Sequence, residues 1–256
     1  MTPQQPFKGN FKKTQGYWDN ANNYPGGKHA GLDLLPFISS GIPGEGTPYP
    51  ASIYPILPGR TIGINDSDNI RGRGIKVRSE LDFSFIRYLK DKGLVPIDYD
   101  NKVFLEHLYW HCLEVTDKDG LVDKETFIAV CGNTGWVTSG GLPVPDEAKG
   151  VPPYPGLHLH LECILKGENQ TFNLNQDSQG RIDPEVILAY EKEKSMKLIK
   201  NNGTVYLVAG KDDLKVTGIS DEQTLMAFFG DEPIEEGELP TDQTLTLTTG
   251  FIAHKR

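Results

Sequence analysis

The sequence lacks any long run of apolar residues. No stretch of the 256-residue chain approaches the roughly 20 consecutive apolar residues that a membrane-spanning helix needs. The amino-terminal stretch MTPQQPFKGNFKKTQ has no apolar core followed by a small-residue cleavage site, so it differs from a conventional secretory signal. We therefore expect no membrane insertion and no signal peptide.

Clusters of basic residues are also missing. The net charge is −9, and residues 201–256 alone hold four basic and ten acidic side chains. Because nucleic-acid binding depends on clustered Lys and Arg, this charge argues against a nucleic-acid partner. The chain has no glycine-rich phosphate loop of the P-loop or dinucleotide kind either.

Cysteine is scarce, and its number is odd. Cys112, Cys131 and Cys163 each lie in apolar runs, and no two of them form a CxxC pair. Free cysteine behaves as a small apolar side chain that is usually buried. We expect three buried reduced thiols, which fits synthesis in a reducing compartment.

The residues that are abundant favour a β-rich fold. The chain has 28 Gly and 18 Pro, and short β-favouring stretches alternate with turn residues. We expect a mainly β, antiparallel arrangement with strands at residues 48–57, 59–64, 74–78, 104–113 and 126–131. Residues 81–90 could form a helix that ends at Gly93, as an insertion at the domain's edge.

Two histidines lie two residues apart in the stretch from Gly156 to Glu162. Since strand side chains repeat every second residue, His158, His160 and Glu162 should share one face. Paired imidazoles suit a metal ligand beside a proton-transfer group. A solvent-facing or core pair gives the same pattern, so the motif alone is weak.

A second stretch far upstream, from Lys28 to Pro36, contains His29 and Asp33. Gly31 and Pro36 make a helix unfavourable, so we expect a loop that enters a short strand. His29, Asp33 and one histidine of the later pair would leave a fourth position open, which is typical of catalytic zinc.

Several motifs, taken in order, resemble the lysostaphin-type zinc metallopeptidases, which cut peptide stems and cross-bridges in bacterial cell walls. The resemblance runs from about Phe7 to about Lys166. It covers His-x-x-x-Asp, Tyr-x-His, Gly-x-Thr-Gly and His-x-His, with a Gly-Thr-Pro run after the aspartate. Motifs in the right order are more specific than any one alone.

The resemblance implies an antiparallel, β-sandwich-like peptidase domain that binds one zinc ion per chain. Its ligands would be His29, Asp33 and His160, whereas His111 and His158 would act on protons. A tyrosine of the family can contact the reacting carbonyl, and Tyr24 and Tyr109 are the candidates in this chain.

Three other residues or segments near these motifs have open roles. His107 has no family counterpart, so we expect a structural histidine there. Glu162 is conceivable as a general base, although no His-Glu-x-x-His motif surrounds it. Residues 136–155 form a proline-rich insertion that either borders the substrate groove or is a passive loop.

We expect three segments along the chain. Residues 1–172 would form the peptidase domain and suffice for catalysis. Residues 173–230 would hold a helix from Arg181 to about Ile199 and then a small β-β-α unit, together an α+β appendage. Residues 231–256 would be an acidic, Thr-rich mobile tail.

The expected activity is therefore zinc-dependent cleavage of peptide bonds in bacterial peptidoglycan. Without a signal peptide, the chain resembles phage lysins, which are made in the host cytoplasm and reach the wall at lysis or in the virion. Alternatives are a noncatalytic protein that binds the wall or activates another hydrolase, and a virion structural component that docks on phage tail proteins.

Overall fold

In the computed structural model, the chain forms two compact units, Met1–Tyr190 and Glu191–Arg256. The structure describes residues 1–19, 28–42, 45–68, 70–116, 120–172, 179–190, 197–201, 204–208, 217–219 and 235–236. None of the helices in these ranges has the length and apolar character needed to cross a bilayer.

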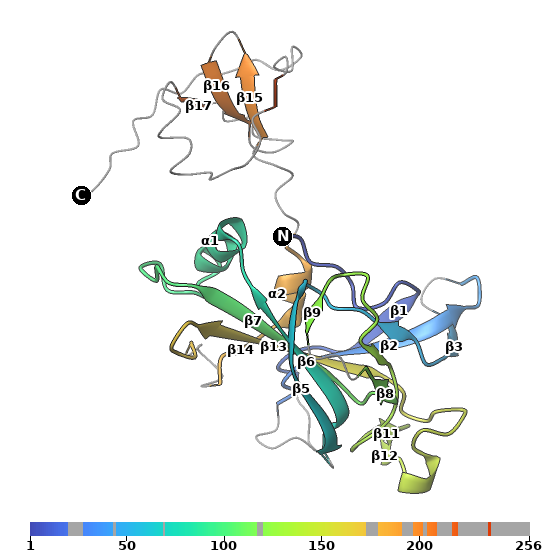
Figure 1. The fold of residues 1–256 in the computed structure, drawn as a ribbon. Coiled ribbons are helices and arrows are strands. Elements are labelled where there is room, and N and C mark those ends of the chain that lie inside the picture. The colour runs from blue at the N-terminus through green and yellow to red at the C-terminus, as the bar shows by residue number, and fades with distance from the viewer. Residues whose placement is uncertain are drawn as a thin grey trace. The chain divides into compact units, whose positions relative to one another are not determined.

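A large antiparallel sheet dominates the first unit (Figure 1). Its strands follow the order β1-β2-β13-β7-β6-β5-β9, with β3 paired to β2 and β14 to β13. Their bounds are β1 Phe11–Gln15, β2 Leu32–Ser39, β3 Gly46–Pro48, β5 Gly59–Asp68, β6 Gly72–Glu80, β7 Val103–Trp110, β9 Leu121–Val122, β13 Leu159–Gly167 and β14 Arg181–Ile182. The mainly β, antiparallel prediction is confirmed.

Two smaller sheets of the first unit lie in its connecting segments. One has the order β4-β10-β8, and the other is the hairpin β11-β12. Their bounds are β4 Ser52–Ile53, β8 Glu114–Val115, β10 Ala129–Val130, β11 Thr138–Ser139 and β12 Leu142–Pro143, and the 3-10 helix η1 spans Asp146–Ala148. The 136–155 insertion therefore contains short regular elements that its prolines did not lead us to expect.

The core lies on one face of the large sheet. Strand alternation sends every second residue of β7 and β13 to this face, where they meet Ile53 and Ala129 of the small sheet. Cys112, Cys131 and Cys163 are buried free thiols, as predicted.

The predicted helix in residues 81–90 is present as α1, Phe83–Asp91. Asp82 caps it by accepting a hydrogen bond from the Phe85 backbone N–H, and Gly93 follows its end with a φ of +69°. Phe85 and Leu89 bury its apolar face, so α1 belongs to the core of the first unit.

Residues beyond the predicted boundary at 172 complete this unit. β14 pairs with β13, and the short helix α2, Pro184–Leu188, follows it. Ile187 is fully buried, and the Tyr190 ring stacks on Phe85 with centroids 4.1 Å apart. The first compact unit therefore ends at Tyr190.

The predicted long helix from Arg181 to about Ile199 is wrong. α2 ends at Leu188, and residues 197–201 form a strand. The charged composition favoured a helix, but pairing with a following strand decided the conformation of Lys197–Asn201 instead. Near the amino terminus, β1 pairs with β2.

The second unit contains a four-stranded sheet of order β17-β16-β15-β18. Its bounds are β15 Lys197–Asn201, β16 Thr204–Val208, β17 Thr217–Ile219 and β18 Glu235–Glu236. The predicted helix of the β-β-α unit lies outside the described residues. The predicted tail does too, apart from β18, which pairs in parallel with β15.

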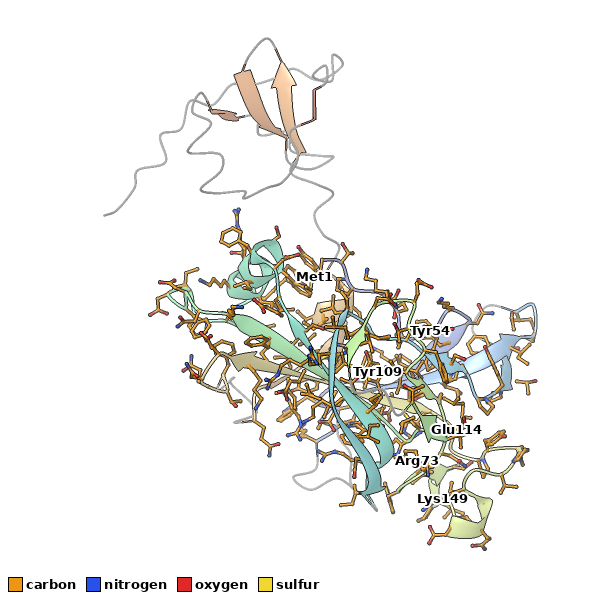
Figure 2. The ribbon with its side chains drawn as sticks, in the orientation of Figure 1. Met1, Tyr54, Arg73, Tyr109, Glu114 and Lys149 are labelled. Carbon is orange, nitrogen blue, oxygen red and sulfur yellow. The ribbon has the colours of Figure 1, made fainter. Side chains whose placement is uncertain are left out.

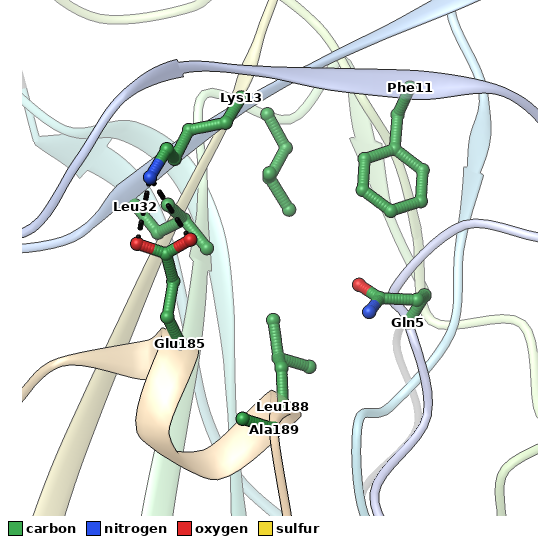
Figure 3. A pocket seen from close by; sticks show the side chains of 8 residues that line it. Gln5, Phe11, Lys13, Leu32, Glu185, Leu188 and Ala189 are labelled. Atoms are coloured by element: carbon green, nitrogen blue, oxygen red, sulfur yellow. Dashed lines mark hydrogen bonds and ion pairs between the residues drawn. The ribbon is translucent and has the colours of Figure 1, made fainter.

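A cavity of about 310 Å³ lies between β1, β2 and α2 (Figure 3). Leu32 and Leu34 line it from β2, whereas Lys13 and Glu185 form an ion pair across it at 2.9 Å. Both charged side chains are about half exposed, so this pair stabilises the surface only weakly.

Candidate metal centre

The register of two neighbouring strands brings the upstream and downstream motifs together. In the β2–β13 pair, His160 lies directly opposite Asp33. His29 precedes β2 in a loop, and Gly31 lets this loop approach β13. A Cβ on Gly31 would lie 2.6 Å from the Leu161 carbonyl oxygen and 2.8 Å from the His160 ring. Glycine is therefore required between the two upstream candidates.

Three side-chain atoms converge at this place. The distances are 3.0 Å from His29 Nε2 to His160 Nδ1, 3.1 Å from His29 Nε2 to Asp33 Oδ1, and 2.9 Å from His160 Nδ1 to Asp33 Oδ1. These three residues form the group that could hold a metal ion among the described residues, and all three are buried.

The remaining ring nitrogens of the two histidines face oxygen atoms. His29 Nδ1 lies 2.8 Å from the Gly16 carbonyl oxygen, which can only accept a hydrogen bond. His160 Nε2 lies 3.4 Å from Glu162 Oε1. In neutral rings, His29 Nε2 and His160 Nδ1 therefore carry lone pairs that face each other and a carboxylate oxygen.

This arrangement fits a zinc ion. Three acceptors 2.9–3.1 Å apart repel each other unless a cation or a proton lies between them. A tetrahedral zinc with bonds of about 2.0–2.1 Å holds its ligand atoms about 3.3 Å apart, so a shift of a few tenths of an ångström suffices. Two imidazoles and one carboxylate are also a usual catalytic zinc set.

A buried carboxylate behind His160 orients that ring. Glu162 has no exposed surface, and it accepts hydrogen bonds from Arg71 Nε at 3.0 Å and from Arg181 Nε at 2.8 Å. Carboxylates in this position fix the tautomer of a metal-binding histidine. Glu162 faces the far nitrogen of His160, so its position suits orientation of the ligand better than general-base chemistry.

The protein's own charges keep both carboxylates ionised. Burial alone would raise the pKa of Asp33, but the charge of His158 and the hydrogen-bond contacts with His160 and His29 hold it well below its usual range. Burial acts the same way on Glu162, yet the hydrogen bond and charge of His160, with Arg71 and Arg181, lower its pKa to about 2.

In the absence of a metal ion, His160 can carry a proton that interacts with the carboxylates of Asp33 and Glu162. Burial would lower its pKa, but hydrogen bonds to Asp33 and Glu162 and their charges raise it to about 9. A divalent cation would take the place of that proton, because both satisfy the same cluster of acceptors.

His111 reaches the site through an unusual backbone turn. β7 ends at Trp110, and His111 has a φ of +64°. The side chain of His111 therefore does not continue the alternation of β7, since this left-handed residue breaks it. Its ring lies 4.7 Å from the His158 ring and 5.9 Å from the His160 ring, between centroids.

Backbone carbonyls also orient the two remaining imidazoles. His111 Nδ1 lies 2.7 Å from the Thr134 carbonyl oxygen, and His158 Nδ1 lies 2.8 Å from the Gly156 carbonyl oxygen. Both rings therefore leave Nε2 for chemistry, and His158 Nε2 lies 3.7 Å from Asp33 Oδ2. Burial and then the charges of His158 and His160 lower the pKa of His111 well below its usual value, which keeps it neutral.

One of the two tyrosine candidates, Tyr109, does not join this cluster. Tyr24 lies outside the described residues. Tyr109 is fully buried (Figure 2), and its hydroxyl accepts from the Ile56 backbone N–H at 2.8 Å and contacts His107 Nδ1 at 2.6 Å. No part of Tyr109 reaches a surface where a substrate could lie. His107 is a buried structural histidine, as expected.

Several groups of the site had no signal in the sequence. The carbonyls of Gly16, Thr134 and Gly156 belong to the backbone, so no side chain reveals them. A glutamate inside the apolar strand β13 does imply a buried counter-charge. Only the fold shows that Arg71 and Arg181 supply that charge.

No family model and no curated protein matches the sequence, whereas solved structures do. A zinc-containing peptidase from Vibrio cholerae is 18% identical with a TM-score of 0.39, and the match covers 73% of this chain but only 39% of that one. The catalytic domain of the antimicrobial peptidase lysostaphin from Staphylococcus simulans is 21% identical with a TM-score of 0.39, covering 70% and 93%.

A third similar structure, the SpoIIQ–SpoIIIAH pore-forming complex, is 13% identical with a TM-score of 0.41, and the match covers 73% of this chain and 90% of that one. Such low identities and TM-scores carry no argument about chemistry. The assignment of function therefore rests on this chain's own residues.

Proposed function

We propose that the protein is a zinc-dependent endopeptidase that hydrolyses peptide bonds of bacterial peptidoglycan. The observation that supports it most is the convergence of His29 Nε2, Asp33 Oδ1 and His160 Nδ1 beside two further imidazoles. In this proposal the first three residues hold one zinc ion per chain, and His111 and His158 act on protons.

A bound zinc ion would supply Lewis acidity, lowering the pKa of the attacking water and polarising the scissile carbonyl. The chain's own groups would do the rest. Nε2 of one neutral imidazole, His111 or His158, accepts the proton of the attacking water. Nε2 of the other, when protonated, donates to the developing oxyanion or to the leaving amine.

The substrate class comes from the resemblance of the sequence motifs to lysostaphin-type peptidases. It implies a stem peptide or a cross-bridge of the wall, and a phage-type lysin or virion-associated enzyme that meets peptidoglycan after synthesis in the host cytoplasm. Docking on phage tail proteins through the second unit belongs to the same proposal.

Metal analysis combined with digestion of defined muropeptides tests the proposal. The purified protein should bind close to one zinc per chain, cleave one type of peptide bond and lose that activity with a chelator. Asp33→Ala should lose both metal and cleavage. Unchanged cleavage by metal-free Asp33→Ala would refute zinc dependence.

Single substitutions separate metal ligands from proton-transfer groups. His160→Ala should lose zinc, whereas His158→Ala and His111→Ala should keep it and lose about 10²- to 10⁴-fold in kcat. His107→Gln is the matched control, because His107 lies in the core and contacts no member of the cluster. Zinc loss in His158→Ala with retention in His160→Ala would reverse the assignment.

The noncatalytic alternative predicts a different result. A protein that only binds the wall would hold zinc and sediment with peptidoglycan but release no new amino groups. The retained set of three ligands and two further imidazoles favours the enzyme, since a binding protein needs none of the proton-transfer groups.

A further inference from the structure

Asn133 lies between two residues, Gly132 and Thr134, whose backbone carbonyls accept hydrogen bonds from the two proton-transfer histidines. It belongs to the turn Gly132–Gly135, and its side chain has no exposed surface. Its Nδ2 donates to the Pro155 carbonyl oxygen at 3.0 Å and to that of Ala148 at 3.4 Å, while its Oδ1 accepts from the Gly150 N–H at 2.7 Å. One amide thus ties three points of the 136–155 insertion to the turn.

The backbone on both sides of Asn133 contacts the histidines directly. Gly132 accepts a hydrogen bond from the His158 N–H at 3.1 Å, and the Thr134 carbonyl accepts from His111 Nδ1 at 2.7 Å. The Thr134 hydroxyl donates to the Cys112 carbonyl at 3.0 Å, which fixes the chain just after His111.

The residue that directly follows the insertion orients His158. Pro155, which accepts from Asn133, immediately precedes Gly156, whose carbonyl accepts from His158 Nδ1 at 2.8 Å. Gly156 has a φ of +71°, and a Cβ there would lie 2.7 Å from the Thr138 carbonyl oxygen. The carbonyl that orients His158 therefore depends on how the insertion is held.

We propose that Asn133 is a positioning residue that sets the relative placement of His111 and His158 by clamping the 136–155 insertion onto the Gly132–Gly135 turn. This inference rests on the proposed function. It also gives the insertion a role in catalysis, since the insertion leads directly into Gly156, whose carbonyl holds one of the two imidazoles.

The chemistry of the amide explains why asparagine suits this place. Two of its partners are carbonyl oxygens and the third is an N–H, so the side chain must donate and accept at once. Asp at position 133 would keep the acceptor but direct a second oxygen at two carbonyls. Only a protonated carboxyl would restore one donor.

The first test compares Asn133→Ala with Ser79→Ala in the full chain. Ser79 is fully buried and its hydroxyl hydrogen-bonds the core histidine His107, so its substitution lowers stability away from the site. Asn133→Ala should lower kcat at least tenfold on a defined muropeptide, with KM within threefold and zinc content unchanged. Ser79→Ala should keep kcat within twofold at a similar fall in Tm.

A second variant keeps the proposal testable if Asn133→Ala does not fold. For Asn133→Asp, the kcat ratio of variant to wild type should rise severalfold as pH falls from 8 to 5.5, because a protonated Asp donates to the Pro155 carbonyl. Amide exchange of Gly150, measured without substrate, should be slow in the wild type and faster in either variant.

The outcomes separate this inference from the proposed function. If the wild type cleaves no muropeptide, the proposed function fails, and the Gly150 exchange still tests the clamp. If the wild type is active, the positioning role is overturned by unchanged kcat or by zinc loss in Asn133→Ala. It is also overturned if Ser79→Ala loses as much kcat, or if the kcat ratio for Asn133→Asp does not depend on pH.

Discussion

Ending the chain at Tyr190 should preserve the folded first unit, whereas ending it at Asn173 should destroy it. The difference removes β14, α2 and the residues up to Tyr190, and with them the buried side chains of Ile182, Ile187 and Tyr190. Burying a side chain of this size stabilises the fold by about 1.5–3 kcal/mol. The shorter chain therefore loses about 5–9 kcal/mol, an amount comparable with the whole stability of an ordinary domain.

The shorter chain would lose a part of the site as well. Arg181 donates to Glu162 at 2.8 Å, and Glu162 lies behind the candidate ligand His160. Without Arg181, this buried carboxylate loses one of its two arginine partners. Its negative charge is then poorly compensated, which costs further stability.

Thermal unfolding, zinc content and cleavage of a soluble cross-bridge peptide should be measured for both chains and the full protein. We expect the chain ending at Tyr190 to keep one zinc and at least a tenth of the peptide activity. Ile187→Ala in that chain provides an intermediate, with an expected loss of about 2–5 kcal/mol. The chain ending at Asn173 should be insoluble or melt at least about 10 °C lower.

A result in which both shortened chains melt within about 3 °C of each other would refute this reasoning. It would also support the sequence-based expectation that residues 1–172 suffice for catalysis. Activity on intact cells gives separate information about the second unit. A loss on cells but not on the soluble peptide, in the chain ending at Tyr190, indicates a docking or targeting role for residues 191–256.

Three further predictions concern single residues. Glu162→Gln keeps the shape but not the charge of the carboxylate, so zinc affinity measured by competition with a chelator should fall about 10- to 100-fold. Burial lowers the pKa of His107 to about 3, so the unfolded chain binds its proton first as the medium is acidified. The free energy of unfolding should therefore fall from about pH 6.5 toward pH 3, by up to about 1.4 kcal/mol per pH unit, and denaturant titrations should show a flatter slope for His107→Gln. Lys13→Ala should change the free energy of unfolding by less than about 1 kcal/mol, because its ion pair with Glu185 is half exposed. A larger change would show that the residues around the adjacent cavity depend on this ion pair for stability.

Strand periodicity let the sequence predict much of this site. The alternation of β13 is local, so placing His160 and Glu162 on one face needed no tertiary information. The turn residues around Gly31 predicted the loop that enters β2. The mainly β fold and helix α1 also followed from local patterns.

Other features depended on contacts between distant segments. Two-residue spacing is symmetric, so it cannot distinguish His158 from His160. In the fold, pairing of β2 with β13 places His160 Nδ1 at 2.9 Å from Asp33 Oδ1 and leaves His158 Nε2 at 3.7 Å from Asp33 Oδ2. The sequence also predicted a helix that continues to about Ile199, but Lys197–Ile199 lie in strand β15, where cross-strand pairing prevails over helical propensity.

The sequence by itself determined the residue types of the candidate site, their order and the strand faces that carry them, because these properties depend on neighbours in the chain. Only the tertiary structure decided which atoms meet. His111 reaches the site because its backbone adopts a φ of +64°, contrary to strand alternation. Glu162 orients His160 because Arg71, from the turn between β5 and β6, and Arg181, from β14, both hold its charge. Such convergence arises when strands pair in register, and no pattern along a single strand contains it.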